Sequence, residues 1–202
     1  MAYQRKDSYY VSAKAAGYRS RAAYKLLELA RRYRLIVPGD HVVDLGAWPG
    51  GWLQVAAEIA GPRGVVVGVD LVPIEPIAGG TVSCIRGDAR DSAVQEEIRR
   101  RCAQEVDVLL CDMAPKLTGV RARDEARAAE LAEAALSVAQ HVLRPGGRLL
   151  MKLFMSAQTE ALVARLRRCF QSVKLTGSQA TRRGSAEQYL VAIGFCPEKA
   201  TS

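Results

Sequence analysis

The chain has 202 residues, of which 49% are hydrophobic and 25% are charged. This length and balance are typical of a single soluble globular domain and exclude a disordered or fibrous protein. No apolar run approaches the roughly 20 residues of a membrane span, and the first residues lack the apolar stretch of a secretory signal. We therefore expect a cytoplasmic protein that does not associate with a membrane.

The cysteines and histidines show neither disulfide nor metal-ligand spacing. The five cysteines contain no CxxC pair, and neither His41 nor His141 has a cluster of cysteines or acids near it. Such a set predicts reduced thiols and no metal site.

The net charge of +8 is concentrated at the N-terminus. Residues 1–34 carry nine lysines or arginines against two acids, whereas the rest of the chain is close to neutral. The same segment holds five tyrosines: Tyr3, Tyr9, Tyr10, Tyr18 and Tyr24. Positive charge with aromatic rings suits a polyanion whose bases can stack, so RNA is the expected partner. On composition alone, a basic tail that only improves solubility is an equally good interpretation.

In chain order, the first predicted element is a helix at 19–34. Apolar residues recur there at helical spacing, and Ser20 is a candidate N-cap. Pro38-Gly39 then interrupts the pattern. We divide residues 1–202 into a basic extension at 1–18, this N-terminal helix, and a core at 40–196, all within one domain.

From residue 41 onward, predicted strands alternate with predicted helices. We expect strands at 41–45, 64–70, 82–86, 106–111, 147–154, 172–176 and 187–195. We expect helices from about residue 52, near 91–102, near 124–143 and near 157–170, with a turn at 144–147. The strands are β-branched without strict polar alternation, as expected of strands covered on both faces. The fold class is therefore α/β, a mostly parallel sheet covered by helices.

A glycine-rich loop, DLGAWPGGW at 44–52, lies where the first predicted strand ends and a helix begins. Gly46 and Gly50 would let the backbone approach a ligand closely at the carboxyl end of a parallel strand, where α/β sheets bind ligands. The loop is not GxGxxG and has no Walker lysine, which disfavours a phosphate ligand. A glycine-rich turn needed only for packing is the alternative.

Two acids follow the next two predicted strands. Asp70 stands at the distance from the loop at which an acid in such folds hydrogen-bonds ribose hydroxyls. Asp88 comes after the following strand and can accept a hydrogen bond from an adenine amino group. A single aspartate at a strand end is more often a turn residue, but aspartates at successive strand ends outline a nucleoside site.

Five motifs in order resemble the FtsJ-type RNA 2′-O-ribose methyltransferases across nearly the whole chain. They are RSRAAYKL at 19–26, VDLGAWPGGW at 43–52, DMAP at 112–115, PGG at 145–147 with MKLF at 151–154, and SAEQY at 185–189. The resemblance implies a seven-stranded Rossmann-like sheet with its last strand antiparallel, and S-adenosylmethionine as cofactor. It also implies a uridine of large-subunit ribosomal RNA as substrate.

The resemblance assigns roles to individual residues. Cofactor-binding positions fall on Gly50, Trp52, Asp70, Asp88 and Asp112, beside Gly46 of the loop. The family's Lys-Asp-Lys-Glu catalytic tetrad falls on Lys25, Asp112, Lys152 and Glu187. Trp48 stands where a small residue is common, and Met155-Ser156-Ala157 differs from the usual glycine-containing stretch. These departures concern the shape of the pocket rather than the chemistry.

Lys152 is the candidate general base. It lies in the apolar run LLMKLF, where an unpaired ammonium is costly, and Lys25 is a candidate second cation. Asp112 and Glu187 would orient the lysine and the ribose. The alternative for Lys152 is an edge-strand residue that extends to water.

Two other functions compete with a ribose methyltransferase that acts on ribosomal RNA. One is a noncatalytic RNA-binding module on a methyltransferase scaffold, which the complete tetrad argues against. The other is a nicotinamide-dependent Rossmann enzyme, which the missing GxGxxG motif and the basic N-terminus argue against. Transfer RNA and other RNAs remain open as substrates, and a monomer is the expected state.

Overall fold

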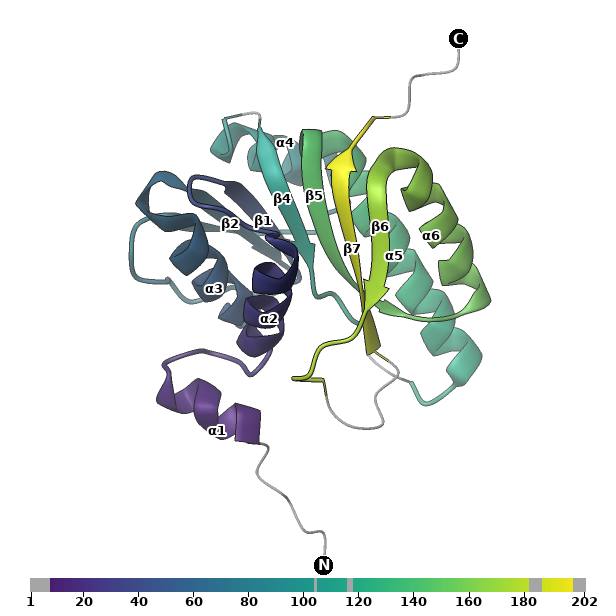
Figure 1. The fold of residues 1–202 in the computed structure, drawn as a ribbon, viewed down its shortest axis with the longest axis horizontal. Coiled ribbons are helices and arrows are strands. Elements are labelled where there is room, and N and C mark those ends of the chain that lie inside the picture. The colour runs from purple at the N-terminus through teal and green to yellow at the C-terminus, as the bar shows by residue number, and fades with distance from the viewer. Residues whose placement is uncertain (1–7, 104, 116–117, 182–186, 198–202) are drawn as a thin grey trace, which may run out of the picture.

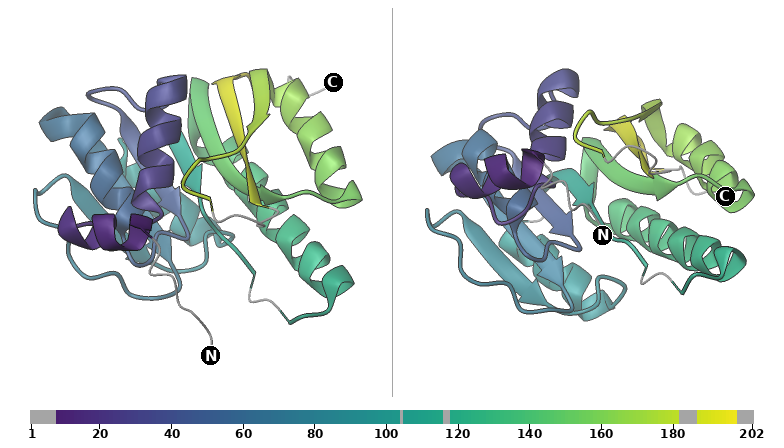
Figure 2. Two further views of the ribbon diagram at one scale, coloured as in Figure 1. Left: turned by 60° about the horizontal axis from the view of Figure 1, so that its bottom comes forward. Right: turned by 90° about the horizontal axis from the view of Figure 1, so that it is seen from below.

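The computed structural model describes residues 8–103, 105–115, 118–181 and 187–197. These residues form one seven-stranded sheet with helices on both faces (Figures 1 and 2). The strands are β1 His41–Leu45, β2 Val65–Asp70, β3 Val82–Arg86, β4 Val106–Cys111, β5 Leu143–Phe154, β6 Phe170–Thr176 and β7 Glu187–Phe195. The α-helices are α1 Ser8–Ala15, α2 Ala23–Tyr33, α3 Gly51–Ala60, α4 Ser92–Arg101, α5 Arg121–Val142 and α6 Ala157–Cys169, with a 3-10 turn, η1, at Gly61–Arg63. No helix in these ranges is both long and apolar enough to cross a bilayer.

The strand order is β3-β2-β1-β4-β5-β7-β6. β1 to β5 pair in parallel, and β7 pairs antiparallel with both β5 and β6. This confirms the expected Rossmann-like sheet with its last strand antiparallel. β2, which follows β1 in the chain, pairs on one side of β1, and β4 pairs on the other side. The connections therefore run in opposite directions from this point, and a crevice opens at the carboxyl ends of β1 and β4.

The sheet is buried between two apolar layers. On one face, α2 and α3 pack against alternate residues of the strands, including Val42, Val66 and Val108. On the other face, α4, α5 and α6 cover the intervening residues, such as Val43 and Val67. Figure 2 shows the two layers from further directions. The absence of polar alternation in the strand sequences follows from this burial on both faces.

The N-terminal region differs from the prediction. The expected helix at 19–34 begins at Ala23, and a separate helix, α1, lies within the predicted extension. Ala22 occupies the N-cap position of α2, without a side-chain cap. Ser20 instead packs against the first turn of α3, where a Cβ on Gly51 would come within 2.3 Å of the Ser20 Oγ. Tertiary contact with α3 therefore replaces the cap that the local pattern predicted.

The start of β5 also differs from the prediction. The expected turn at 144–147 lies inside β5, which begins at Leu143. Leu143 pairs with Val106, whereas Arg148 pairs with Val108, so four residues of β5 lie opposite one residue of β4. The segment thus protrudes as an irregularity of the strand rather than as a connection before it.

Candidate active site

The loop between β1 and α3 depends on its glycines. Gly46 has φ 74° and Gly50 has φ 110°, both in the region that disfavours other residues. A Cβ on Gly46 would come within 2.8 Å of Cγ of Met113, which follows β4. The backbone after β1 and the segment after β4 therefore touch at the crevice, and only glycine permits this approach.

Arg19 fastens this loop to the segment after β2. Its guanidinium donates hydrogen bonds to the carbonyl of Pro49 at 3.2 Å, of Glu75 at 2.7 Å and of Pro76 at 2.6 Å. The Arg19 backbone N–H donates to Gln54 Oε1 at 2.8 Å. Sequence reasoning placed Arg19 in a helix and gave it no role, because its partners are carbonyls that no side-chain pattern reveals.

A pocket of about 480 Å³ lies at the carboxyl ends of β1, β2 and β4. Four of the predicted cofactor residues line it: Gly46, Asp70, Asp88 and Asp112. Trp48 and Met113 also line it, and α5 closes one side with residues that include Glu130. The acids predicted from successive strand ends are thus brought together in one pocket.

The two acids after β2 and β3 are held in different ways. Asp70 accepts hydrogen bonds from the backbone N–H groups of Trp48 and Val72, both at 2.9 Å. Asp88 forms an ion pair with Arg90 at 2.5 Å, and the hydrogen bonds from Arg90 lower the pKa of Asp88. Both carboxylates are therefore fixed acceptors at the pocket wall.

The charge of the pocket restricts its ligand. Four acids line it, Asp70, Asp88, Asp112 and Glu130, against one guanidinium, that of Arg90. Such a lining suits a cationic ligand that carries hydroxyl and amino donors, and it repels a diphosphate. A sulfonium nucleoside such as S-adenosylmethionine fits these residues, whereas a nicotinamide dinucleotide does not.

Gly50 and Trp52 are not among the residues that line this pocket. Trp52 is buried under α2, where its indole N–H donates to the carbonyl of Ala22 at 2.8 Å. Its ring lies 6.2 Å from that of Tyr189. Gly50 lies against the side chain of Arg19, since a Cβ at Gly50 would come within 3.1 Å of Arg19 Nη1. The structure thus places Trp52 in the packing between α2 and α3, and its cofactor contact stays a prediction from the resemblance.

The four tetrad residues form two ion pairs at the carboxyl end of the sheet. Lys152 Nζ lies 2.7 Å from Asp112 Oδ1 and 2.8 Å from the Asp112 carbonyl oxygen. Lys25 Nζ lies 2.5 Å from Glu187 Oε1. Because Phe154 pairs with Glu187 across the β5–β7 ladder, β7 starts beside the carboxyl end of β5, the strand next to β4. Register alone therefore brings Glu187 to the crevice.

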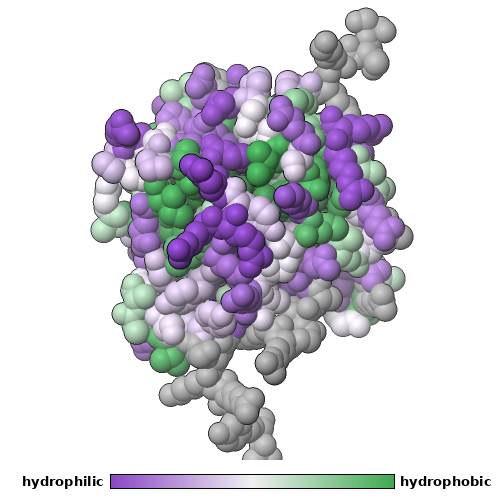
Figure 3. Space-filling view, in the orientation of Figure 1, coloured by the Kyte–Doolittle hydropathy of each residue, from purple (hydrophilic) through white to green (hydrophobic). Residues whose placement is uncertain are grey.

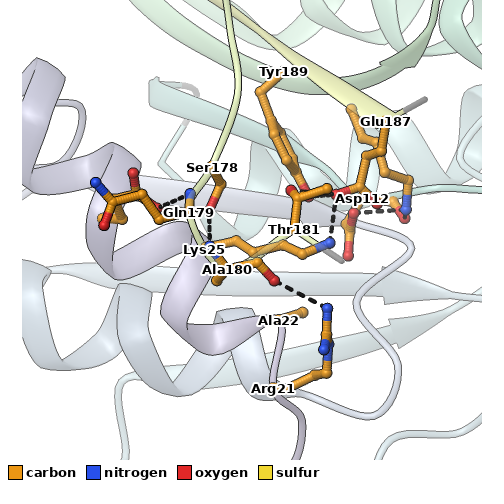
Figure 4. Close-up of polar contacts among 12 residues, drawn as sticks. Arg21, Ala22, Lys25, Asp112, Ser178, Gln179, Ala180, Thr181, Glu187 and Tyr189 are labelled. Carbon is orange, nitrogen blue, oxygen red and sulfur yellow. Dashed lines mark hydrogen bonds and ion pairs between the residues drawn. The ribbon is translucent and has the colours of Figure 1, made fainter. Parts of the chain in front are cut away.

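From the described residues, Glu187 accepts three hydrogen bonds at one oxygen. The donors to Oε1 are Lys25 Nζ, the Tyr189 hydroxyl at 3.0 Å and the Thr181 hydroxyl at 3.2 Å (Figure 4). Burial by itself raises the pKa of Glu187, but the hydrogen bond from Lys25 and the charges of Lys25 and Lys152 lower it overall. Glu187 is therefore an ionised anchor for Lys25.

The pKa of Asp112 is raised, whereas that of Glu187 is lowered. Burial raises the pKa of Asp112, and the ion pair with Lys152 offsets only part of that effect. Asp112 also lines the pocket, so this residue joins the pocket to the tetrad. A reacting hydroxyl beside Lys152 would thus lie at the edge of the pocket.

The segment 177–181, which precedes β7, is fastened to α2 beside the tetrad (Figure 4). Glu28 Oε2 accepts hydrogen bonds from the Ser178 hydroxyl at 2.6 Å and from the Gln179 backbone N–H at 2.8 Å. Arg21 donates to the Ala180 carbonyl at 2.9 Å. We call this set of contacts the α2 clasp. Sequence reasoning missed it, and the next residues, 182–186, which include Ser185 and Ala186 of the SAEQY motif, lie outside the described residues.

The fold and the pocket together define a Rossmann-like methyltransferase. The model of the FtsJ-like methyltransferase family matches residues 18–195, and the chain belongs to that family. Membership and fold imply S-adenosylmethionine as the methyl donor.

Curated relatives and solved structures agree with this assignment. A Methanoculleus marisnigri protein named ribosomal RNA large subunit methyltransferase E is 48% identical, over 94% of this chain and 92% of the relative. A protein of the same name from Acidithiobacillus ferrooxidans is 44% identical, over 94% and 86%. A Plasmodium falciparum crystal structure, whose description names a ribosomal RNA methyltransferase, matches with a TM-score of 0.77 and 28% identity, over 88% and 98%.

Proposed function

We propose that this protein transfers a methyl group from S-adenosylmethionine to a ribose 2′-hydroxyl of RNA. The observation that carries the proposal is the contact between Lys152 and Asp112 at the mouth of an acid-lined pocket. The buried pair of Lys25 and Glu187 completes the set. A hydroxyl is a poor nucleophile until its proton is removed, and a lysine amine at this position can accept that proton.

The pocket residues are assigned by their chemistry. Asp70 would accept hydrogen bonds from the cofactor ribose, Asp88 from the adenine amino group, and the backbone at Gly46 would lie against the cofactor. Asp112 would face the cationic end of the ligand. When bound, the cofactor supplies an electrophilic methyl group on a sulfonium.

The tetrad residues then divide the remaining work. Lys152 in its neutral form takes the proton of the 2′-hydroxyl, and Asp112 holds its Nζ in position. Lys25, anchored by Glu187, orients the ribose. Because the leaving group is neutral, alignment and proton removal are the main tasks left to the protein.

The relatives named as ribosomal RNA large subunit methyltransferases support ribosomal RNA as the substrate, and we propose a uridine of the large subunit. The protein is proposed to act as a cytoplasmic monomer organised as one domain. A noncatalytic RNA-binding module and methylation of another RNA, such as transfer RNA, are the alternatives.

Mapping of 2′-O-methyl groups in total RNA, from cells with and without the protein, tests the proposal. We expect one large-subunit uridine to lose its methyl group when the protein is absent. If 2′-O-methyl groups are lost only from transfer RNA, transfer RNA and not ribosomal RNA is the substrate. No change anywhere, for a protein that binds S-adenosylmethionine, would support the noncatalytic module.

A further inference from the structure

A second depression, of about 650 Å³, runs along α2 on the other side of the α2 clasp from the tetrad. Its lining comes from α1, α2, the segment that follows α2, the end of α3 and the clasp segment. We call it the α2 groove and define it by Tyr9, Tyr24, Leu27, Arg31, Arg34 and Gln179. None of these residues belongs to the pocket or to the tetrad.

The floor of the α2 groove is apolar and aromatic. Leu27, Ile36 and Ile59 line it. The rings of Tyr9 and Tyr24 lie 5.8 Å apart at 54°, and neither tyrosine is fully exposed. An aromatic pair beside an aliphatic floor offers a surface on which a nucleobase can stack.

The rim of the α2 groove is positively charged. Arg31 and Arg34 are exposed, and within the described ranges neither has a carboxylate partner. Glu28 also lines the groove, but its carboxylate is engaged by Arg32 and by the clasp. Figure 3 shows hydrophilic side chains gathered in the middle of this face, where Figure 1 places α2, with hydrophobic areas on either side.

The α2 groove lies close to the tetrad. Ala180 lines the groove, and the next residue, Thr181, donates to Glu187. Along α2, Arg31 follows Lys25 by six residues, or about 9 Å at the helical rise of 1.5 Å per residue. That separation is on the scale of one or two nucleotides of an extended strand.

We propose that the α2 groove binds a nucleotide of the RNA strand that neighbours the methylated one. Its base packs on Tyr9 and Tyr24, and its phosphate lies near Arg31 and Arg34. The negative charge of RNA and the stacking capacity of its bases complement the rim and the floor. This inference rests on the proposed RNA substrate.

Filter binding of large-subunit ribosomal RNA, over a range of salt concentrations, tests the groove. Arg31→Gln should weaken binding about three- to fivefold and make the salt slope shallower by about 0.7, because one phosphate contact is lost. Tyr24→Leu should weaken binding about tenfold, whereas Tyr24→Phe should stay within about twofold, because stacking needs the ring and not the hydroxyl. Arg167→Gln, an exposed arginine on α6, is the matched control and should bind as wild type.

Steady-state methyl transfer separates this role from a purely structural one. Both weakening variants should raise KM for RNA with little change in kcat and with unchanged S-adenosylmethionine affinity. If Arg31→Gln and Tyr24→Leu bind RNA as wild type and still methylate it, RNA binding in the α2 groove is refuted, whereas the proposed methyl transfer is not. If RNA binding falls in these variants but the wild-type protein methylates no RNA, RNA binding in the α2 groove is supported and the proposed methyl transfer is refuted. A dimer of the chain that Tyr24→Leu dissociates, with RNA affinity unchanged, would assign the groove to a second copy instead.

Discussion

The side chains of Lys152 and Lys25 are only 8% and 9% exposed, and each lies within hydrogen-bond distance of one carboxylate. This burial argues against the alternative in which Lys152 extends to water from an edge strand. It also means that removal of one partner leaves a buried charge without compensation. Substitutions in the two ion pairs should have different effects, because only Lys152 contacts Asp112, the tetrad residue that lines the pocket.

Lys152→Ala should fold and bind S-adenosylmethionine but lose methyl transfer by on the order of 100-fold or more, as expected for loss of a positioned general base. Lys152→Arg should not restore activity, because a guanidinium stays protonated. Single-turnover methylation of ribosomal RNA measures both variants. Arg63→Ala, at an exposed arginine of η1, serves as control. Turnover of Lys152→Ala within a few-fold of wild type would refute the assignment.

Asp70→Ala should weaken S-adenosylmethionine binding by about 1–3 kcal/mol, through lost hydrogen bonds to the ribose and lost support of the Trp48 amide. Calorimetry on cofactor-free protein measures the loss. Asp91→Ala, at an exposed acid ahead of α4, should leave the affinity unchanged. Equal losses in the two variants would show a general effect of charge rather than a specific contact.

Asp44, at the end of β1, is completely buried, and neither of its oxygens accepts a hydrogen bond within the described residues. Burial raises the pKa of Asp44 well above its usual value, and Asp112 and Asp70 raise it further. The unfolded chain therefore releases this proton near pH 4, whereas the folded chain keeps it to higher pH. The contribution to stability is complete below about pH 4 and is lost as the pH rises through the raised value.

Asp44→Asn should remove this pH dependence. The variant should be less stable than wild type near pH 4.5, by about 1–3 kcal/mol, because its amide donors lack acceptors. The deficit should shrink as the pH rises toward 7.5. Asp124→Asn is the control. The hydrogen bond from the Thr118 amide lowers the pKa of Asp124, so its carboxylate is ionised at both pH values and the difference from wild type should stay nearly constant. Urea unfolding at both pH values measures this, and a constant difference between wild type and Asp44→Asn would contradict it.

At the scale of elements, the α2 clasp connects the helix that carries Lys25 to the strand that begins with Glu187. Glu28→Ala removes the acceptor of the Ser178 hydroxyl and the Gln179 amide, so the segment should loosen and Thr181 should lose its contact with Glu187. We expect methyl transfer to fall on the order of tenfold, with S-adenosylmethionine affinity unchanged.

Hydrogen exchange tests the same variant locally. Loss of a hydrogen bond to a charged group, about 1.5–3 kcal/mol, should speed exchange of the Gln179 amide by at least tenfold. Glu133→Ala breaks an exposed ion pair with Arg165 on the opposite layer and should change neither measurement. Wild-type exchange at Gln179 in Glu28→Ala would mean that the segment is held by other contacts.

The elements also explain which parts of the fold could be predicted. The strands at 41–45, 106–111 and 187–195 have the predicted bounds because each is a largely buried apolar run, and the strand at 82–86 because Gly80 and Gly87 punctuate it. Asp70 and Asp88 could be predicted because strand ends meet at one edge of a parallel sheet, and Asp112 followed from the resemblance. Glu130 was not predicted, because it reaches the pocket from α5. The start of α2, the clasp and the position of Trp52 were not predictable, since each depends on contacts between segments far apart in the sequence.

At the scale of the whole molecule, negative and positive charges gather in different regions. The pocket is acid-lined, which suits a cationic cofactor, whereas residues 1–34 carry almost all of the net positive charge. Phosphate binding is dominated by such a sequence-independent field. The earlier expectation that this segment provides RNA affinity can therefore be tested without disturbing the pocket.

Removal of the segment is a poor test, because α1 contacts α2 through the rings of Tyr9 and Tyr24 and its Ala13 is buried. Neutralisation of Arg5, Lys6 and Lys14 keeps the helix, and Lys14 is exposed. Three phosphate contacts at about 0.7 each predict a salt slope shallower by about two for ribosomal RNA, with weaker binding and unchanged S-adenosylmethionine affinity.

A second triple variant, with Arg63, Arg99 and Arg167 changed to Gln, lowers the net charge by the same three units elsewhere on the molecule. If the position of the charge matters, only the N-terminal variant loses RNA affinity and salt dependence. Equal losses would mean that RNA responds to net charge alone. Unchanged binding in both would make residues 1–18 a solubilising segment. RNA affinity would then have to come from the C-terminal side, from Arg165, Arg168 and Lys174, and from Arg182 and Arg183, which lie outside the described residues.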